Sequence, residues 1–259
     1  MTDRLTWIST KKIYISGSYL SIANYIPTQI NIQTGIKTDT RWWQVIKFFT
    51  WHPYRIFANL FIDGFIRRVI KRFLNEYLES QSVFLEIGCG DMEFRKYLPD
   101  SLTYNAIDIS LSEFHLKRVL KEKRVNICLA SATNIPLPSN SVSLVVSSEC
   151  FGHIENVEDA LIEIHRVANP GAKLICSISN SFCYKYQKKG KHPNQLHLWS
   201  YQSFINLMES IGYKMIKGSM CGYWIPMPKW LGHISFHLPI SSKEEKFNTN
   251  FFFVFEIIK

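Results

Sequence analysis

The sequence predicts an α/β fold with a doubly wound, mostly parallel sheet, and three observations support this prediction. Between residues 82 and 180, short β-branched apolar runs alternate with segments of helical periodicity. The spacing of these segments fits right-handed strand–helix–strand units. Hydrophobic residues make up 46% of the 259 positions and charged residues 20%, so the chain can form a packed core.

Five runs have the length and composition of short buried strands: residues 82–87, 104–109, 125–130, 142–147 and 173–179. Helical periodicity marks residues 92–98, 111–123 and 157–167. Asn169, Pro170 and Gly171 are expected to stop the last helix and turn the chain into the fifth strand. Because ligands of parallel sheets bind at the carboxyl ends of the strands, we expect the functional residues just after the first four strands.

We expect the chain to have two parts, an aromatic and basic N-terminal extension at residues 1–80 and an α/β domain at residues 81–259. In the extension, residues 42–49 are rich in aromatic side chains, and residues 56–78 carry an apolar stripe with helical spacing. The favoured interpretation is a helical extension that packs on the sheet or covers the active site. The alternative is peripheral contact with an anionic membrane surface.

Charge and cysteine content restrict the partners and the compartment. The net charge of +9 favours an anionic partner such as nucleic acid, acidic lipid or a phosphorylated substrate, without choosing among them. The six cysteines show no zinc-ligand spacing, which indicates a reducing compartment and no structural metal. No signal-peptide core and no apolar run of about 20 residues is visible, so a cytoplasmic location is expected.

The segment Glu86-Ile87-Gly88-Cys89-Gly90 ends the first predicted strand. Glycines at this place let the backbone approach a ligand closely, and a following helix would present its N–H groups to an anion. A dinucleotide fingerprint would need a third glycine where the chain has Glu93, and a P-loop would need a following Gly-Lys-Ser/Thr. Asp108 closes the second strand at about the separation where a carboxylate meets a ribose in doubly wound folds.

These motifs, taken in order, resemble the class I S-adenosylmethionine-dependent methyltransferases. The segments that carry the resemblance are 85–90, 106–110, 132–141, 147–154 and 160–172, within roughly residues 80–215. The nearest subgroup acts mainly on small molecules and is related to ubiquinone-pathway methylases. The family implies a seven-stranded, Rossmann-like sheet whose last strand is antiparallel, and residues 250–258 fit that strand.

The resemblance implies S-adenosylmethionine as the cofactor and a set of residues that would bind it. These residues are Glu86, Gly88, Gly90, Asp108, Ile109, Ser131, Ala132 and Ser148. Asp108 would hold the ribose hydroxyls, because a carboxylate can accept two hydrogen bonds from a vicinal diol. Two departures from the family pattern are a serine at 131, where an acidic residue is frequent, and Asp91-Met92, where glycine is frequent.

Two histidines are the candidate catalytic residues. Methyl transfer is an in-line displacement, so a base is needed only if the nucleophile keeps its proton. His153 follows the fourth strand and could accept a proton near neutral pH, or it could cap a local turn. By the resemblance, His197 faces the substrate side, before a helix at 201–210 that Ser200 would cap. The basic segment 184–192 is either a lid over an anionic substrate or a solvated loop.

Three functions compete. The favoured one is methylation of a small-molecule acceptor, on an oxygen of a hydrophobic, lipid-linked or glycan-type compound. The second is nucleic-acid methylation, which the net charge suggests. However, the fourth strand ends in Ser147-Ser148-Glu149-Cys150 rather than in Asn/Asp-Pro-Pro-aromatic, and no Pro-Cys dipeptide occurs. The third is a non-catalytic scaffold that binds the cofactor, which the departures at 91 and 131 suggest.

Overall fold

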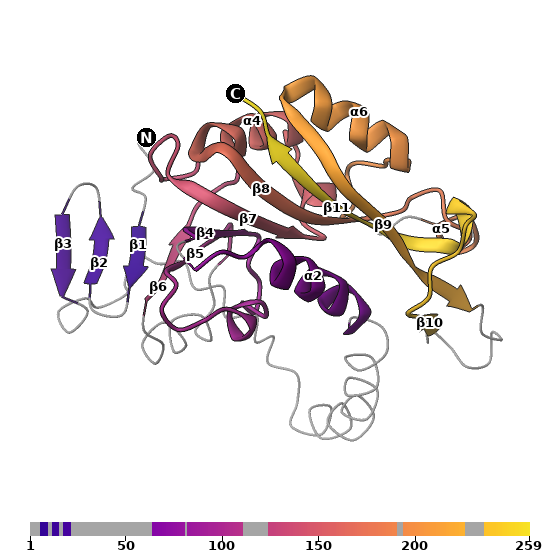
Figure 1. Ribbon diagram of the computed structural model, residues 1–259, viewed down its shortest axis with the longest axis horizontal. Coiled ribbons are helices and arrows are strands. Elements are labelled where there is room, and N and C mark those ends of the chain that lie inside the picture. The colour runs from indigo at the N-terminus through magenta and orange to yellow at the C-terminus, as the bar shows by residue number, and fades with distance from the viewer. Residues whose placement is uncertain are drawn as a thin grey trace, which may run out of the picture.

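The computed structural model describes residues 6–9, 12–15, 18–21, 64–80, 82–110, 124–190, 194–225 and 236–259. These residues form an eleven-stranded sheet in the order β10-β9-β11-β8-β7-β4-β5-β6-β1-β2-β3. Helices α4 and α6 cover one face of the sheet, and α2 covers the other (Figure 1). The predicted α/β class is therefore confirmed.

The centre of the sheet is parallel and doubly wound. Its strands are β4 (Phe84–Ile87), β5 (Tyr104–Asp108), β6 (Val125–Leu129), β7 (Val142–Ser148) and β8 (Ala168–Ser179). β4 pairs in parallel with both β5 and β7, so the chain runs outward to β6 and then returns to the other side of β4. The five predicted strands are all present. The crevice between β4 and β7 is the switch point at which such sheets bind ligands.

Antiparallel strands complete the sheet on its C-terminal side. β11 (Asn248–Ile257) lies between β8 and β9 (Tyr213–Ile225) and is antiparallel to both. Its run Phe251–Phe255 is fully buried, with alternate side chains in the cores on the two faces of the sheet. The implied seven strands, ending in an antiparallel one, are thus β6, β5, β4, β7, β8, β11 and β9.

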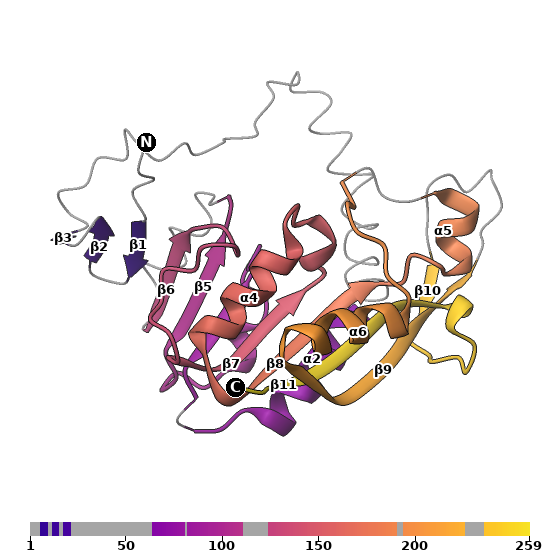
Figure 2. The same cartoon turned by 90° about the horizontal axis from the view of Figure 1, so that it is seen from above.

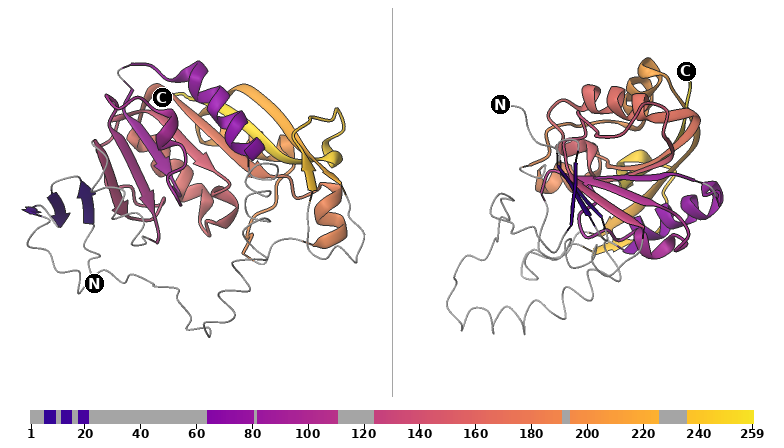
Figure 3. Two further views of the ribbon diagram at one scale, coloured as in Figure 1. Left: turned by 90° about the horizontal axis from the view of Figure 1, so that it is seen from below. Right: turned by 90° about the vertical axis from the view of Figure 1, so that its left-hand side faces the viewer.

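Four more strands extend this sheet at its two edges. β10 (Phe236–Leu238) pairs with β9 at one edge. At the other edge, β1 (Thr6–Ser9) pairs antiparallel with β6, and β2 (Lys12–Ile15) and β3 (Ser18–Ser21) follow as a meander. Figure 3 shows these indigo strands beyond the β6 edge. The extension, expected to be helical, therefore contributes three strands as well as the helix described below. β6 would otherwise be an edge strand with unpaired backbone groups, and β1 satisfies them.

The helices on the two faces follow their predicted apolar patterns. α4 (Val157–Val167) buries Ala160, Leu161 and Ile164 against the sheet. α6 (Tyr201–Ile211), on the same face (Figure 2), begins as predicted, with Ser200 Oγ accepting the Ser203 amide at 3.2 Å. The capped N-terminus fixes the end of the loop that precedes it.

The helix α2 (Gly64–Tyr77) covers the opposite face of the sheet. Its buried side chains Phe65, Ile70, Phe73 and Leu74 belong to the core beneath β8 and β11. This part of the predicted apolar stripe therefore packs on the sheet, which was the favoured interpretation. Residues 42–49 and 56–63 lie outside the described residues. No helix in the ranges given above is long and apolar enough to cross a membrane.

Three local predictions differ from the structure. Residues 92–98 form turns and the short 3-10 helix η2 (Arg95–Tyr97), because Met92 has a left-handed backbone with φ 53°. Asn169–Gly171 lies inside β8, since α4 ends at Val167 and Ala168 is already extended. Residues 184–189 form a short helix, α5 (Tyr184–Lys189), rather than a loop. Residues 111–123 and 191–193 lie outside the described ranges.

Candidate active site

A cavity of about 520 Å³ opens at the carboxyl ends of β4, β5, β6 and β7. It lies at the switch point of the sheet, where the sequence predicted the functional residues. Its lining residues are Ile87, Gly88, Ile107, Asp108, Ile109, Ala130, Ser131, Ala132, Ser148, Glu149, Cys150, His153, Ile154, Glu155 and Leu196. The volume is in the range of small-molecule sites.

The loop after β4 requires glycine for two different reasons. Gly88 has φ 66°, and a Cβ placed on it would lie 2.5 Å from the Cys150 Sγ. A larger residue at 88 would therefore collide with the loop after β7. Gly90 has φ 45°, and nothing lies within 4 Å of the position of its Cβ. Gly88 thus allows the two loops to pack closely. Gly90 has no such contact, and glycine is favoured there only by the left-handed backbone of the turn.

The Asp108 carboxylate is held in place at the end of β5 by two backbone amides. Its Oδ2 accepts the Gly90 amide at 3.0 Å, and its Oδ1 accepts the Ser110 amide at 3.0 Å. Each carboxylate oxygen can accept a further hydrogen bond, so both atoms keep capacity for a ligand. The glycine loop and Asp108 therefore form one preorganised unit. Glu86 lies below this unit, buried in β4, and accepts a hydrogen bond from the Tyr104 hydroxyl.

The loop after β6 is fixed by a partly buried ion pair. The Arg166 guanidinium donates to the carbonyl oxygens of Ile135 at 3.0 Å and Leu137 at 3.1 Å. Glu163 pairs with Arg166 and accepts the Ile135 amide at 2.9 Å. The hydrogen bond from Arg166 holds the pKa of Glu163 below its usual value. This pair anchors the segment that carries Ser131 and Ala132, both of which line the cavity.

The exit of β7 brings hydroxyl, carboxylate and thiol groups to the same cavity. Ser148 Oγ lies 3.3 Å from Ser177 Oγ on β8. Glu149 accepts a hydrogen bond from Ser179 Oγ at 2.7 Å through its Oε2. Burial raises the pKa of the Cys150 thiol to about 12, so this group stays neutral near pH 7.

Comparison with known proteins identifies the family of the central strands. Residues 85–176 match the family model described as a methyltransferase domain. Residues 85–176 thus form a class I methyltransferase domain. An uncharacterized methyltransferase of Schizosaccharomyces pombe is 25% identical over 135 residues, which are 46% of this chain and 48% of that protein. An uncharacterized methyltransferase-like protein of the same organism is 36% identical over 99 residues, 38% of each chain. The chain thus matches less than half the length of these relatives.

Solved structures agree with this family at the level of the fold. The 1,6-didemethyltoxoflavin-N1-methyltransferase of Burkholderia thailandensis superposes with a TM-score of 0.56 at 13% identity. The match covers 84% of this chain and 89% of that one. That structure contains bound 1,6-didemethyltoxoflavin and S-adenosylhomocysteine. At this identity the likeness shows a shared methyltransferase fold.

The cofactor of this family is S-adenosylmethionine, and the cavity of the methyltransferase domain fits it. Six of the eight residues that the resemblance implies line the cavity: Gly88, Asp108, Ile109, Ser131, Ala132 and Ser148. Gly90 contributes through its amide bond to Asp108, and Glu86 lies beneath the loop. A carboxylate beside an open glycine turn, with apolar Ile107 and Ile109, suits a ligand with a ribose and a flat base. The role of each residue stays a prediction.

His153 lines the same cavity from the short helix η3 (Phe151–His153). Its Nδ1 lies 2.8 Å from the Asn194 carbonyl oxygen, which can only accept, so Nδ1 carries the hydrogen. In the neutral ring the lone pair is then on Nε2, as a base requires. The side chain is exposed at the mouth of the cavity. Its predicted catalytic role is compatible with this geometry.

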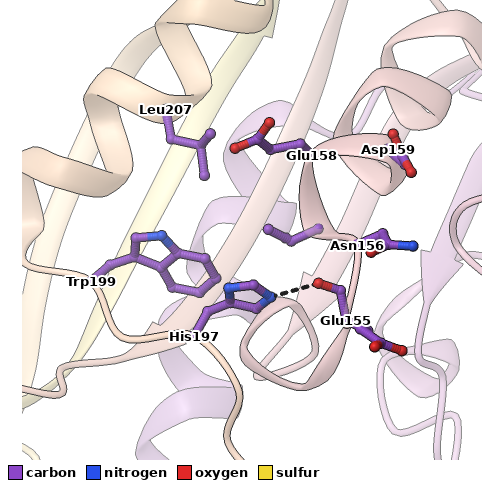
Figure 4. Close-up of a pocket in the computed structure, with 8 residues that line it drawn as sticks. Glu155, Asn156, Glu158, Asp159, His197, Trp199 and Leu207 are labelled. Atoms are coloured by element: carbon purple, nitrogen blue, oxygen red, sulfur yellow. Dashed lines mark hydrogen bonds between the residues drawn. The ribbon is translucent and has the colours of Figure 1, made fainter.

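His197 lies in a neighbouring cavity of about 400 Å³ (Figure 4). Its Nε2 donates to the carbonyl oxygens of Ile154 at 2.7 Å and Glu155 at 3.0 Å, and its ring stacks on Trp199. The two candidate histidines therefore do not share a cavity, although Glu155 lines both cavities. A catalytic role for His197 would need an acceptor that extends into the second cavity.

Sequence reasoning missed two polar lining residues, Glu149 and Cys150, in a segment where it selected only Ser148 and His153. A signal for Glu149 was present, because a charged residue directly after a buried strand also marked Asp108. It also missed Leu196, in the segment between α5 and α6. The Leu196 amide donates to the Gly152 carbonyl oxygen at 2.8 Å, and Leu196 lines the cavity. No sequence pattern indicates that long-range contact.

Proposed function

We propose that this protein transfers a methyl group from S-adenosylmethionine to a small-molecule acceptor. The acceptor atom is an oxygen of a hydrophobic, lipid-linked or glycan-type compound. The observation that carries the proposal is the Asp108 carboxylate, which the Gly90 and Ser110 amides orient inside the switch-point cavity. In this assignment Asp108 binds the ribose hydroxyls, and Ile109, Ser131 and Ala132 surround the adenine.

The composition of the cavity wall supports a small, uncharged acceptor over nucleic acid. None of the described residues that line the cavity is lysine or arginine, although the chain has a net charge of +9. Recognition of a nucleic-acid backbone depends on such cations near the site. Several lining residues are apolar, among them Ile154 and Leu196. The small-molecule substrate bound in the Burkholderia thailandensis structure is in keeping with this choice.

When bound, the cofactor supplies an electrophilic methyl group on a sulfonium. The protein residues orient the two reactants and exclude water, which is the main contribution an enzyme makes to an in-line displacement. His153 and Leu196, at the cavity mouth, come from two segments joined by the Asn194–His153 and Leu196–Gly152 hydrogen bonds. The six free thiols of the chain fit a protein of a reducing compartment, and we place the enzyme in the cytoplasm.

Two measurements test the proposed function. Isothermal titration with S-adenosylhomocysteine should give saturable binding at one site per chain. Radiolabelled S-adenosylmethionine should then pass its label to a small hydroxyl compound. Binding without transfer to any acceptor would favour the scaffold function, and transfer to RNA or DNA oligonucleotides would favour the nucleic-acid function.

A further inference from the structure

Glu149 has a backbone conformation that its residue type rarely adopts. Its φ is 54°, in the left-handed region, directly after the last residue of β7. Such strain in a residue other than glycine persists only where the surrounding structure enforces it, and it is concentrated at functional sites. Here the enforcing contacts are two hydrogen bonds from the Glu149 amide to Ser177, to its carbonyl oxygen at 3.0 Å and to its hydroxyl at 3.1 Å. These contacts fix the direction of the side chain.

The two carboxylate oxygens of Glu149 have different environments. Oε2 accepts the Ser179 hydroxyl at 2.7 Å. Oε1 is buried, and no donor among the described residues bonds to it. A buried acceptor atom without a donor is unfavourable unless a ligand supplies the donor. Glu149 also lines the cavity, so a donor on a ligand bound there is the partner that we assign to this oxygen.

A small polar cluster supports this carboxylate from β8 and α5. Burial raises the pKa of the Tyr186 hydroxyl, a hydrogen bond with Ser179 lowers it, and the nearby Glu149 carboxylate raises it. Glu149, Ser179 and Tyr186 are therefore close together at the carboxyl ends of β7 and β8. Within the described residues no lysine, arginine or histidine forms an ion pair with Glu149. The cluster thus contains a carboxyl group that no cation in the described part of the chain pairs with.

The position of Glu149 in the sheet separates it from the ribose side of the cavity. Asp108 lies at the end of β5, whereas the Glu149 side chain bonds to Ser179 at the end of β8. The strand order β8-β7-β4-β5 places β7 and β4 between these two ends. If Asp108 holds the cofactor ribose, Glu149 is on the side left for the methyl acceptor.

We propose that Glu149 binds the acceptor hydroxyl and is the catalytic residue that takes its proton. This inference rests on the proposed function. The acceptor oxygen forms a bond to the methyl carbon, and the carbon–sulfur bond breaks with its electron pair left on sulfur. The hydroxyl proton passes to Oε1 of Glu149, which later releases it to water. A hydroxyl group supplies the donor that Oε1 lacks, and its oxygen is the nucleophile.

His153 is less suited to this step, although it lines the same cavity. Its side chain is exposed at the mouth, and its Nδ1 hydrogen bonds to the Asn194 carbonyl of the covering loop. That contact joins two segments of the cavity wall. In this proposal the exposed His153 shapes the cavity wall, and the half-buried Glu149 is the base.

The test compares Glu149→Gln with the wild type in the presence of labelled S-adenosylmethionine. The probes are para-octylphenol, octanol and octyl glucoside, which represent hydrophobic, lipid-like and glycan-type hydroxyls. We expect transfer to at least one probe, and a loss of about 10²–10⁴-fold in kcat in Glu149→Gln. The affinity for S-adenosylhomocysteine should stay within about twofold, because the proposal assigns Glu149 to the acceptor and not to the cofactor. Glu209→Gln, an exposed change of the same kind on α6, should alter nothing.

A second variant separates catalysis from a structural role. Glu149→Asp keeps the carboxylate, and aspartate tolerates a left-handed backbone better than most residues. It should keep more activity than Glu149→Gln, whereas a purely structural role would favour the isosteric glutamine.

Three outcomes overturn the account in distinguishable ways. Full kcat in Glu149→Gln removes Glu149 from the mechanism. If S-adenosylhomocysteine binds but no hydroxyl probe is methylated, the hydroxyl acceptor is rejected. The same conclusion follows if para-octylaniline is methylated in place of the hydroxyl probes. No binding of S-adenosylhomocysteine by the wild type rejects the proposed function itself.

Discussion

The two halves of the switch-point cavity differ in how their polar groups are satisfied. On the β4–β5–β6 side, the Asp108 carboxylate accepts two backbone amides, and the Arg166–Glu163 pair anchors the next loop. On the β7–β8 side, Glu149 is strained, and one of its oxygens has no donor among the described residues. In the first half both carboxylate oxygens of Asp108 have a hydrogen-bond donor, whereas in the second half Glu149 Oε1 has none among the described residues.

This difference reflects what each half has to bind. A cofactor shared by a whole family can be held by backbone amides, glycines and one carboxylate at fixed places. An acceptor that varies among relatives must be recognised by side chains that vary too. In the proposed function, the more regular half is the cofactor side, and the strained half is the side that determines the substrate.

The largest effect on the cofactor half is expected from Gly88→Ala. A Cβ at this position meets the Cys150 sulfur at 2.5 Å, and the φ of 66° disfavours any side chain. We expect roughly 2–4 kcal/mol of lost stability and a collapse of cofactor binding. Urea denaturation and calorimetric titration measure the two effects.

The matched control for this change is Gly90→Ala. Its Cβ would meet nothing within 4 Å, so only the left-handed backbone opposes it. A loss of about 1–2 kcal/mol is expected. Equal losses for the two variants would show that the contact between the loops after β4 and β7 does not matter.

The next largest effect is expected from Asp108→Ala. Loss of the carboxylate should weaken the binding of S-adenosylhomocysteine by about 1–3 kcal/mol, since a charged hydrogen-bond acceptor is removed. Asp159→Ala, an exposed change on α4, should leave the affinity unchanged. Unchanged affinity in Asp108→Ala would place the ribose elsewhere.

A smaller effect is expected from Arg166→Ala, which removes the anchor of the loop after β6. The partly exposed guanidinium donates to the Ile135 and Leu137 carbonyls, so we expect about 1 kcal/mol of lost stability. The pKa of Glu163 is lowered in the fold, so its stabilisation is present above its unfolded pKa and lost as pH falls through the folded pKa. The difference between variant and wild type should therefore shrink in acid, which denaturation at several pH values measures. A difference independent of pH would contradict the ion-pair contribution.

The smallest effect on transfer is expected from His153→Gln. If Glu149 is the base, kcat should fall by less than about tenfold, much less than in Glu149→Gln. The two variants are compared with the same hydroxyl probe. A loss in His153→Gln that equals or exceeds the loss in Glu149→Gln would return the base to His153.

The cofactor half was largely predictable from the sequence, because its signals are local. Gly88 and Gly90 lie in the loop directly after β4, Asp108 is the last residue of β5, and parallel strands bring their ends together. α4 was predicted at its observed bounds, since five buried positions repeat with helical spacing. The helix predicted over residues 92–98 did not form, because Met92 has a left-handed backbone. Nothing in the sequence marks a methionine for that conformation.

The acceptor half could not be assembled from the sequence, because it depends on contacts between distant segments. Ser179 meets Glu149, and Asn194 meets His153, through pairings that no local pattern encodes. The position of His197 in a second cavity also depends on a distant segment. Its Nε2 donates to the Ile154 and Glu155 carbonyl oxygens, which hold the ring outside the switch-point cavity. The edge strand β1 pairs with β6 across more than a hundred residues, and no pattern in the sequence predicted strands in that region.

The most direct test of the central claim, that the switch-point cavity binds S-adenosylmethionine, is a calorimetric titration of the wild type and Asp108→Ala with S-adenosylhomocysteine. The account predicts saturable binding at one site in the wild type and an affinity about 5–150-fold weaker in the variant. The absence of binding heat at millimolar ligand in the wild type would contradict it.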